Sequence, residues 1–292
     1  MKVHVIFTNR FDSKDIEEVD LANCVCGVID TIRATSTIAT ILGCGGKEAI
    51  IAANKRQAFI FKKIFNDYIL CGEEGGIAPK GFDYGNSPLE ISKLDVKDKG
   101  FILMTTNGTQ SIFKTSQCTA VFALSILNMN YTVDTLVDYA FKNKNDIALL
   151  CSGEKGKIAY DDVYTAGIAV KYLLTKPLRF EFSDSAKLAM TAALTDSDVL
   201  NALEKSCSAN SLRKVCSGED IEFCSQLNKF KIAAKLHILS SKNIKAAEPY
   251  KTYLKNKITK TTYKIDQLFV VRKSDTNMTT FRQVQNKQDL QA

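Results

Sequence analysis

Two charged residues, Asp30 and Arg33, follow an apolar run at 25–29 and carry the first candidate chemistry. The stretch CVCGVIDTIRATSTIAT begins like a strand buried on both faces and continues into residues typical of a helix start. Open α/β sheets bind ligands where such strands end. The carboxylate suits a hard cation, and the arginine with nearby backbone N–H groups suits an anion. The alternative is an ordinary turn in which Asp30 and Arg33 pair with each other.

A glycine-rich loop is the second candidate. It carries Glu73 and Glu74 in GEEGG, then Asp83 and Asn86 in GFDYGNSP. Glycine lets backbone N–H groups approach a phosphate or a metal closely, which favours a ligand site. A long surface loop of turn-forming residues explains the same composition when the loop is taken alone.

The third candidate is TTNGT, formed by Thr105, Thr106, Asn107, Gly108 and Thr109. Asn-Gly after a strand usually indicates a hairpin. The segment 110–116 is polar and does not resemble a returning strand. We therefore favour a tight turn into a helix, whose N-terminus and threonine hydroxyls would form an anion cradle.

The fourth candidate is CSGEKGK at 151–157, followed by Asp161 and Asp162 at a predicted helix start. Acidic residues at a helix N-terminus are ordinary, since they interact favourably with the helix dipole. An adjacent pair beside a glycine turn also suits the oxygen ligands of Mg²⁺. The pair alone does not decide between the two.

Alternating strands and helices must position these clusters. Strands are predicted at 3–8, 25–29, 48–53, 68–71, 101–104, 121–124 and 147–151, and helices after 34 and at 54–65, 132–142 and 161–174. This order indicates an α/β fold, a layered mixed or mostly parallel sheet flanked by helices. Parallel strands would bring the polar clusters to one edge of the sheet, where we expect Asp30 and Arg33 to face solvent or ligand, outside the core. The segment 12–20 is polar and predicts an acid-rich helical turn or loop.

A Cys-x5-Arg spacing runs from Cys207 to Arg213, as in thiol-based phosphatases. Those loops are glycine-rich and follow a strand, whereas this segment contains no glycine and has the pattern of a helix. The spacing therefore does not favour a catalytic role. The two histidines, His4 and His237, lie outside every cluster, so the chemistry is expected to proceed without histidine.

The composition is that of an ordinary globular protein. Of 292 residues, 45% are hydrophobic and 24% charged, so a sizeable core is expected. The net charge of +7 comes from scattered lysines, and no stretch interleaves basic and aromatic residues as nucleic-acid grooves do. The nine cysteines lack paired ligand spacings, which indicates reduced thiols in a cytoplasmic protein. Neither a signal peptide nor a membrane-spanning run is apparent.

The chain divides by composition into two parts. Residues 1–234 hold all the polar clusters and form the predicted α/β domain. Residues 235–292 form a lysine-rich C-terminal extension with one apolar patch at 268–271 and a polar tail. An added strand-and-helix appendage, a contact in a homo-oligomer and partial disorder are the alternatives for this extension.

The ordered set of motifs resembles the 2-phosphosulfolactate phosphatase family. VIDTIRATSTI, GEEGG, GFDYGNSP, TTNGT and CSGEKGKIAYDDVYTAG occur in the family's order, and the resemblance extends to SGEDIEFCSQLNKF, covering roughly 1–231. It implies an α/β fold of the family's own and a Mg²⁺-dependent acid-type phosphohydrolase. The family reaction converts (2R)-2-phospho-3-sulfolactate to 3-sulfolactate and phosphate, in methanogens a step toward coenzyme M.

Carried over to this sequence, the resemblance implies site roles for Asp30, Arg33, Glu73, Asp83, Asn86, Asn107, Gly108, Asp161 and Asp162. Two positions depart from the family pattern. Glu74 stands where the family usually has arginine, which could alter the anion accepted. Asp161-Asp162 replaces the usual Glu-Asp, which shortens the reach of one carboxylate by a methylene.

We therefore predict a magnesium-dependent phosphatase that acts on a small anionic phosphoester. Asp30, Glu73, Asp161 and Asp162 would hold the metal, and Arg33 would bind the phosphate with two parallel hydrogen bonds. Thr105, Thr106, Asn107, Gly108 and Thr109 would supply donors for the developing charge, with Asp83 and Asn86 binding substrate. Asp30 is either nucleophile or metal ligand. Ile32 stands where haloacid-dehalogenase enzymes have a second aspartate, which favours metal-activated water. A phosphatase of another small phosphorylated hydroxy acid and a catalytically silent binder of such metabolites are the alternatives.

Overall fold

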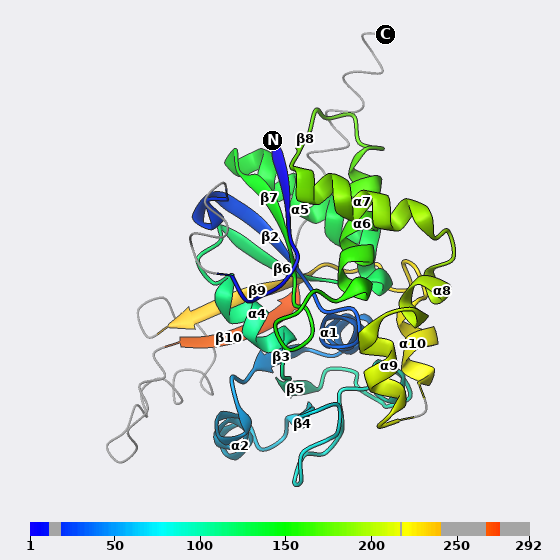
Figure 1. Cartoon of the computed structure of the whole chain (residues 1–292). Helices are drawn as coiled ribbons and strands as arrows, with labels where there is room; N and C mark the ends of the chain where they lie inside the picture. The colour runs from blue at the N-terminus through cyan, green and yellow to red at the C-terminus, as the bar shows by residue number, and fades with distance from the viewer. Residues whose placement is uncertain (12–18, 217, 241–266, 275–292) are drawn as a thin grey trace.

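One ten-stranded sheet runs through the computed structural model, which describes residues 1–11, 19–216, 218–240 and 267–274 (Figure 1). The strand order is β4-β5-β3-β10-β9-β6-β2-β7-β1-β8. The α/β fold predicted from the sequence is confirmed. The strands are β1 (Lys2–Ile6), β2 (Cys24–Ile29), β3 (Glu48–Ile51), β4 (Ile69–Gly72), β5 (Gly100–Met104), β6 (Ala120–Leu124), β7 (Asp146–Cys151), β8 (Glu181–Phe182), β9 (Ala234–Ser240) and β10 (Gln267–Lys273).

Helices connect the strands and form a separate group near the C-terminal end of the described chain. The α-helices are α1 (Ala34–Gly43), α2 (Lys55–Ile64), α3 (Pro88–Ser92), α4 (Gly108–Lys114), α5 (Met129–Asn143), α6 (Tyr160–Leu173), α7 (Asp184–Thr195), α8 (Val199–Glu204), α9 (Cys207–Arg213) and α10 (Glu219–Cys224). Two short 3-10 helices, η1 (Leu21–Asn23) and η2 (Ile126–Asn128), precede β2 and α5. In the described part of the chain, no helix combines the length and apolarity needed to cross a membrane.

The sheet consists of two parallel blocks that run in opposite directions. Strands β4, β5 and β3 are parallel to one another, as are β6, β2, β7, β1 and β8. Between the blocks, β10 is antiparallel to both β3 and β9, and β9 is antiparallel to β6. Three successive reversals leave the blocks antiparallel. We expected parallel strands to bring the polar clusters to one edge of the sheet. The clusters instead follow strands of two blocks that run in opposite directions.

The carboxyl ends of the two blocks nevertheless meet. Asn9, which follows β1, donates from Nδ2 to the carbonyl of Asn107, which follows β5, at 3.3 Å. Gly108 lies against Asp30 and Ala34, which follow β2. In Figure 1 the β2–β7 block enters from above and the β3–β5 block from below, with α1 where they converge. The strand ends thus face each other across the middle of the molecule.

The core explains how this arrangement is held. Side chains alternate along β2, so that Val25 and Ile29 face α5 and α6 in one apolar cluster, while Cys26 and Val28 face α1 in another. This second cluster also contains residues of α4, β3, β5 and β10, so both blocks pack on one shared apolar layer. Helix α2 covers the outer face of the β3–β5 block. Burial of both faces accounts for the continuous apolar run of β2.

The described part of 235–292 belongs to the sheet. The boundary placed after residue 234 falls inside β9, and β9 with β10 forms the antiparallel hairpin that joins the two blocks. The apolar patch at 268–271 lies in β10, where Leu268, Val270 and Val271 are buried. These residues are thus central to the fold. The rest of the extension, and the polar segment 12–18, lie outside the described residues.

Candidate active site

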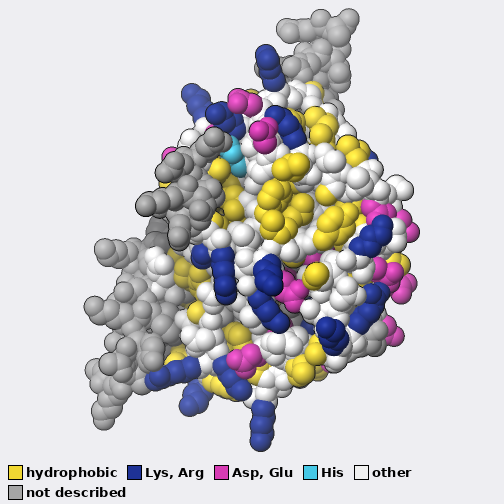
Figure 2. Space-filling view, viewed as in Figure 1, with side chains coloured by type: hydrophobic (Ala, Val, Ile, Leu, Met, Phe, Trp, Pro, Cys, Tyr) yellow, Lys and Arg dark blue, Asp and Glu magenta, His cyan; other side chains and the backbone are white. Residues whose placement is uncertain are grey.

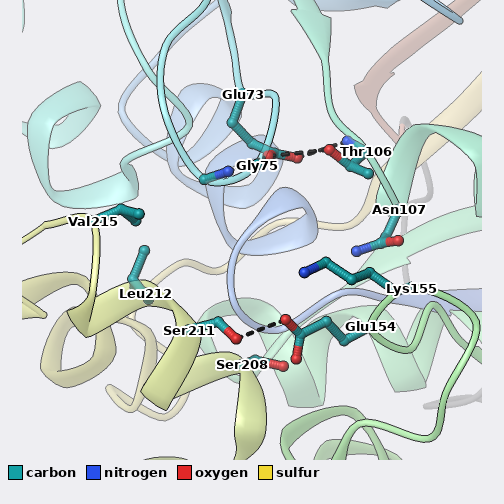
Figure 3. Close-up of a pocket in the computed structure, with 11 residues that line it drawn as sticks. Glu73, Gly75, Thr106, Asn107, Glu154, Lys155, Ser208, Ser211, Leu212 and Val215 are labelled. Atoms are coloured by element: carbon teal, nitrogen blue, oxygen red, sulfur yellow. Dashed lines mark hydrogen bonds between the residues drawn. The ribbon is translucent and has the colours of Figure 1, made fainter.

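A pocket lies between the loops that follow β4, β5 and β7, and helix α9 closes one side of it (Figure 3). Both blocks of the sheet and the C-terminal group of helices therefore contribute to one cavity. Its lining residues are Glu73, Gly75, Gly76, Thr106, Asn107, Glu154, Lys155, Ser208, Ser211, Leu212 and Val215.

Asp30 is fixed at the start of α1. Its Oδ1 accepts a hydrogen bond from the N–H of Ala34 at 3.0 Å, and its own N–H donates to Thr35 Oγ1 at 3.1 Å. Asp30 is 8% exposed, so it is buried, contrary to the expectation of a residue outside the core. Its Oδ2 faces Gly108 and makes no hydrogen bond with another described residue. This oxygen is the one available to a ligand, although neither Asp30 nor the Asp161–Asp162 pair is among the residues that line the pocket.

The adjacent pair Asp161 and Asp162 has two distinct sets of contacts. Asp162 accepts hydrogen bonds from the N–H of Thr31 at 2.8 Å and of Gly153 at 2.9 Å, one on each oxygen. It thereby joins the turn after β2 to the loop after β7. Asp161 Oδ1 accepts from Ser208 Oγ at 2.8 Å, which joins α6 to α9. Both aspartates are buried. A role in capping the helix does not require such burial.

Glu73 joins the two loops of the other block. Its Oε1 accepts from the N–H of Thr106 at 2.6 Å, and its Oε2 accepts from Thr106 Oγ1 at 3.2 Å and from the N–H of Gly76 at 2.7 Å. The carboxylate therefore lies at the pocket wall with both oxygens engaged by neighbouring donors. A carboxylate oxygen retains further lone pairs for a cation beside such bonds.

The TTNGT segment enters helix α4, so the predicted turn into a helix is confirmed and the hairpin is excluded. Thr105 Oγ1 accepts from the N–H of Thr109 at 3.1 Å, and Thr109 Oγ1 donates to the carbonyl of Thr105 at 2.6 Å. Both hydroxyls thus stabilise the start of the helix, and Thr106 donates hydrogen bonds to Glu73. Among the five, Asn107 has a side-chain amide in the pocket lining that makes no hydrogen bond with another described residue.

Arg33 has partners other than those predicted. Its Nη1 donates to Asp220 Oδ2 at 2.7 Å, and its Nη2 donates to the carbonyl of Gly76 at 3.0 Å. The predicted alternative, a pair between Asp30 and Arg33, is not formed. Arg33 is also buried and does not line the pocket. This geometry supports a role in holding the glycine loop in place, in contrast to the predicted contact with phosphate.

Asp83 and Asn86 lie outside the pocket lining. Asp83 Oδ2 accepts from the N–H of Leu70 at 2.8 Å and from Lys62 Nζ at 3.2 Å, so it anchors the loop to β4. The carbonyl of Asn86 accepts from Thr37 Oγ1 at 3.2 Å, and its buried Oδ1 has no partner among the described residues. The structure therefore gives GFDYGNSP a part in shaping the loop, and no contact with the pocket.

Burial and mutual repulsion raise the pKa values of the buried carboxyls. Burial raises the pKa of Asp30 to about 7, with added repulsion from Asp161 and Glu73. Burial raises the pKa of Asp161 to about 6, and the donors around it oppose this shift. The pKa of Asp162 is raised well above its ordinary value by burial and then by the charges of Asp161 and Asp30. These carboxylates are close enough to repel one another, and a cation would relieve that repulsion.

The donor set fits Mg²⁺ in one specific way. Within the described residues, no three carboxylate, thiol or imidazole side chains converge into a complete protein cage for a metal. Mg²⁺ is usually held by one or two carboxylates, with water and substrate phosphate oxygens completing its coordination. Asp30 Oδ2 is available for this role. Ser152 directly follows β7, and its buried hydroxyl has no partner among the described residues. Such orphaned polar groups are typical of sites that bind water or an ion.

Sequence reasoning missed several lining residues and one partner. Lys155, Ser208 and Ser211 line the pocket, and Asp220 holds Arg33. Lys155 lies in the recognised CSGEKGK motif. The two serines lie inside the Cys-x5-Arg segment, which the sequence did not favour as a catalytic site. Cys207 begins that same helix, α9, which confirms the helical prediction for the Cys-x5-Arg segment. Glu74, the departure from the family pattern, is exposed and does not line the pocket.

Comparison with known proteins identifies the family of the chain. The family model described as 2-phosphosulpholactate phosphatase matches residues 11–237. A probable 2-phosphosulfolactate phosphatase from Pseudothermotoga lettingae is 38% identical over 71% of this chain and 87% of its own length. Proteins with the same name from Deinococcus radiodurans and Thermus thermophilus are 31% and 33% identical, over 72% and 69% of this chain and 86% and 83% of their own lengths. The chain belongs to the 2-phosphosulfolactate phosphatase family.

Proposed function

We propose that this protein is a Mg²⁺-dependent phosphatase that hydrolyses (2R)-2-phospho-3-sulfolactate to 3-sulfolactate and phosphate. One observation carries the proposal: Asp30, whose available Oδ2 faces Gly108, is near enough to Asp161 and Glu73 for their charges to raise its pKa, and Glu73 lines the pocket at which the carboxyl ends of both blocks meet. The chain's membership of the 2-phosphosulfolactate phosphatase family supports the same reaction. Glu74 lies outside the pocket, so its reversed charge gives no reason to favour a silent binding protein.

Asp30 and Asp161 would hold the metal, and Glu73, whose charge also acts on Asp30, would lie at the pocket wall. Bound there, Mg²⁺ would neutralise charge on the phosphoryl oxygens and favour attack by water. Asp162, predicted as a further ligand, accepts a backbone N–H on each oxygen and so fixes the two turns that carry Asp30 and Glu154. We assign it chiefly to positioning, and, like Glu73, it retains lone pairs for a metal contact.

Asn107 and Arg33 complete the proposed arrangement in different ways. The free amide of Asn107 can donate a hydrogen bond to a phosphoryl oxygen as negative charge develops there. Arg33 acts through Gly76, whose carbonyl it holds at 3.0 Å, and thereby keeps the turn of the glycine loop at the pocket wall. Asn107 is therefore proposed as a catalytic residue and Arg33 as a positioning residue.

The setting of the enzyme is part of the same proposal. All nine cysteines are free thiols, which is the usual state in a cytoplasmic protein. The substrate is a small phosphoester, and lysine and arginine side chains are scattered among acidic ones on the visible face (Figure 2). This pattern supports a protein that works on a small molecule and not on nucleic acid.

Phosphate release from (2R)-2-phospho-3-sulfolactate tests the proposal directly. We expect turnover with Mg²⁺, loss of turnover when a chelator removes the metal, and recovery when Mg²⁺ is added back. Activity that survives chelation would overturn the metal requirement. Absence of turnover on this substrate, with turnover on another phosphorylated hydroxy acid, would overturn the substrate and retain the reaction.

A further inference from the structure

The rim of the pocket is built from two matched tight turns, one from each block of the sheet. The first pairs Glu74 with Ile77, and the second pairs Glu154 with Lys157. In each turn the two end residues exchange backbone hydrogen bonds. The central positions all have positive φ: +64° and +87° at Gly75 and Gly76, and +52° and +78° at Lys155 and Gly156. The two turns thus have the same backbone form.

Lys155 occupies a position at which the matched turn has Gly75. A positive φ is uncommon for a residue with a long side chain, and glycine is the usual choice there. Such conformations concentrate at functional sites, where the surrounding structure maintains them. The conformation of Lys155 places its side chain in the pocket, and Figure 3 shows its amine directed into the cavity near Asn107.

The amine of Lys155 differs in charge from the ionisable side chains around it in the pocket. Among the described residues that line the pocket, Lys155 carries the only positive charge, whereas Glu73 and Glu154 are acidic. Glu154 accepts a hydrogen bond from Ser211 Oγ at 2.7 Å. Lys155 itself forms no hydrogen bond or ion pair with another described residue, and Arg33 is occupied by Asp220 and Gly76. A substrate anion that enters the pocket would therefore meet one uncommitted cation.

We propose that Lys155 binds the anionic group of the substrate that does not react, a sulfonate or a carboxylate, and so determines specificity. This inference rests on the proposed function, in which the phosphoryl group is bound by the metal and Asn107. An ammonium group has three donors and suits an oxyanion as a compact point charge. Lys155 belongs to the β7 loop and Glu73 to the β4 loop, so the distal anion would be held on the β7 side of the pocket and the phosphoryl group toward Glu73 and Asn107.

The test compares Lys155→Met with the control Lys157→Met, which removes the same charge from the same turn outside the pocket lining. The substrates are phosphosulfolactate, 2-phospholactate, which lacks the sulfonate, and 2-phosphooxyethanesulfonate, which lacks the carboxylate. Loss of a hydrogen bond to a charged group lowers kcat/KM by about 10- to 100-fold. We expect this loss for Lys155→Met on phosphosulfolactate, chiefly through KM, and near-normal values for Lys157→Met.

The truncated substrates identify the group that Lys155 binds. If it is the sulfonate, Lys155→Met and the wild type will have equal kcat/KM on 2-phospholactate. If it is the carboxylate, the two will be equal on 2-phosphooxyethanesulfonate. An equal loss on all three substrates would place Lys155 at the phosphoryl group and overturn the inference, as would no loss on phosphosulfolactate.

Folding and the proposed function are controlled separately. Lys155→Gly places glycine at a positive φ, so we expect an unchanged or higher melting temperature together with the same loss of kcat/KM. Lys155→Arg should retain most of the wild-type kcat/KM, since the positive charge is kept. If the wild type hydrolyses none of the three substrates, the proposed function fails. Calorimetry with 3-sulfolactate then decides the inference: binding lost in Lys155→Met and kept in Lys157→Met supports it, and equal binding by both overturns it.

Discussion

Arg33 Nη1 lies 2.7 Å from Asp220 Oδ2, and each side chain is 6% exposed, so a buried ion pair joins the turn after β2 to helix α10. Asp220 Oδ1 also accepts from Ser87 Oγ at 2.7 Å and from the N–H of Leu89 at 3.2 Å. One carboxylate therefore connects three segments that are distant in sequence. Because α9 lines the pocket and α10 follows it, this contact fixes the group of helices that closes the site.

Asp220→Asn should destabilise the protein by about 3–5 kcal/mol, because it leaves the Arg33 charge buried without a counter-charge. Arg33→Lys should be destabilising as well, since lysine cannot contact both Asp220 and Gly76 with a planar fork. Urea unfolding of the variants measures both effects. An intact free energy of unfolding in Asp220→Asn would contradict a structural role for the pair.

The control is the exposed pair between Arg213 and Glu204, which has the same distance of 2.7 Å. Both of its side chains are more than a third exposed, so solvent screens the interaction. Glu204→Gln should therefore change the free energy of unfolding by less than about 1 kcal/mol. The difference between the two variants isolates the effect of burial.

Asp30→Asn should lower turnover about a hundred-fold, which corresponds to about 3 kcal/mol of lost transition-state stabilisation. The amide keeps the hydrogen bond from Ala34 but removes the charge that would hold the metal. The variant should fold, and its Mg²⁺ affinity, measured by calorimetry, should fall with its activity. Near-normal turnover would mean that Asp30 only braces the turn.

Asp83→Asn provides the comparison, since Asp83 was predicted to bind substrate and the structure places it against Leu70 and Lys62. We expect turnover to stay within about two-fold of the wild type, with a modest loss of stability typical of a partly exposed pair. A large increase in KM would instead show that Asp83 contributes to substrate binding.

Much of the fold could be predicted because its signals are local. The apolar run at 25–29, the glycine turns and the helical period at 161–174 predicted β2, the loops and α6 closely. The opposed direction of the two blocks could not be predicted, because it depends on where β9 and β10 insert. Those strands lie in a lysine-rich segment in which the sequence showed only one short apolar patch, at 268–271.

The site was predictable in its acidic part and not in its partners. Asp30, Glu73 and Asp161 were chosen because carboxylates after strands suit a metal, and the structure brings their charges together. Arg33 was assigned to phosphate because a guanidinium suits an oxyanion. Its partner in the structure, Asp220, is 187 residues away in the chain, and no local pattern connects the two. Contacts between distant segments are set by packing, which a single sequence does not display.

The raised pKa values of Asp30, about 7, and Asp161, about 6, make metal-free stability depend on pH. Unfolded aspartate has a pKa of about 3.9, so between pH ~4 and ~7 the folded state binds more protons than the unfolded state. Stability contributed by these neutral carboxyls is present at low pH and is lost as the pH rises through about 6–7. Added Mg²⁺ should therefore raise the melting temperature more at pH ~8 than at pH ~5.

Melting curves of the wild type and Asp30→Asn, with and without Mg²⁺, measure this effect. Other carboxyls also titrate, so the informative quantity is the difference between the two proteins. Without metal, Asp30→Asn should become the more stable of the two as the pH rises above about 7. A wild type that gains stability over the variant in that range would show that Asp30 is stabilised in its charged form.

Gly108→Ala should disturb the contact between the two blocks and with it the active site. A Cβ at this position would lie 2.4 Å from the Cβ of Ala34 and 2.7 Å from Asp30 Oδ2, distances too short to persist. Such overpacking typically destabilises by about 1–3 kcal/mol. Because the clash acts directly on Asp30, turnover per folded molecule should fall as well.

Gly43→Ala creates a comparable clash elsewhere, since its Cβ would lie 2.3 Å from the ring of Phe230 at the far end of α1. This variant should lose stability by a similar amount while its folded fraction keeps normal turnover. Urea unfolding together with kcat measured well below the melting temperature separates the two cases. If both variants lose stability and neither loses turnover, Gly108 is a packing residue only, and the position of Asp30 does not depend on the opposite block.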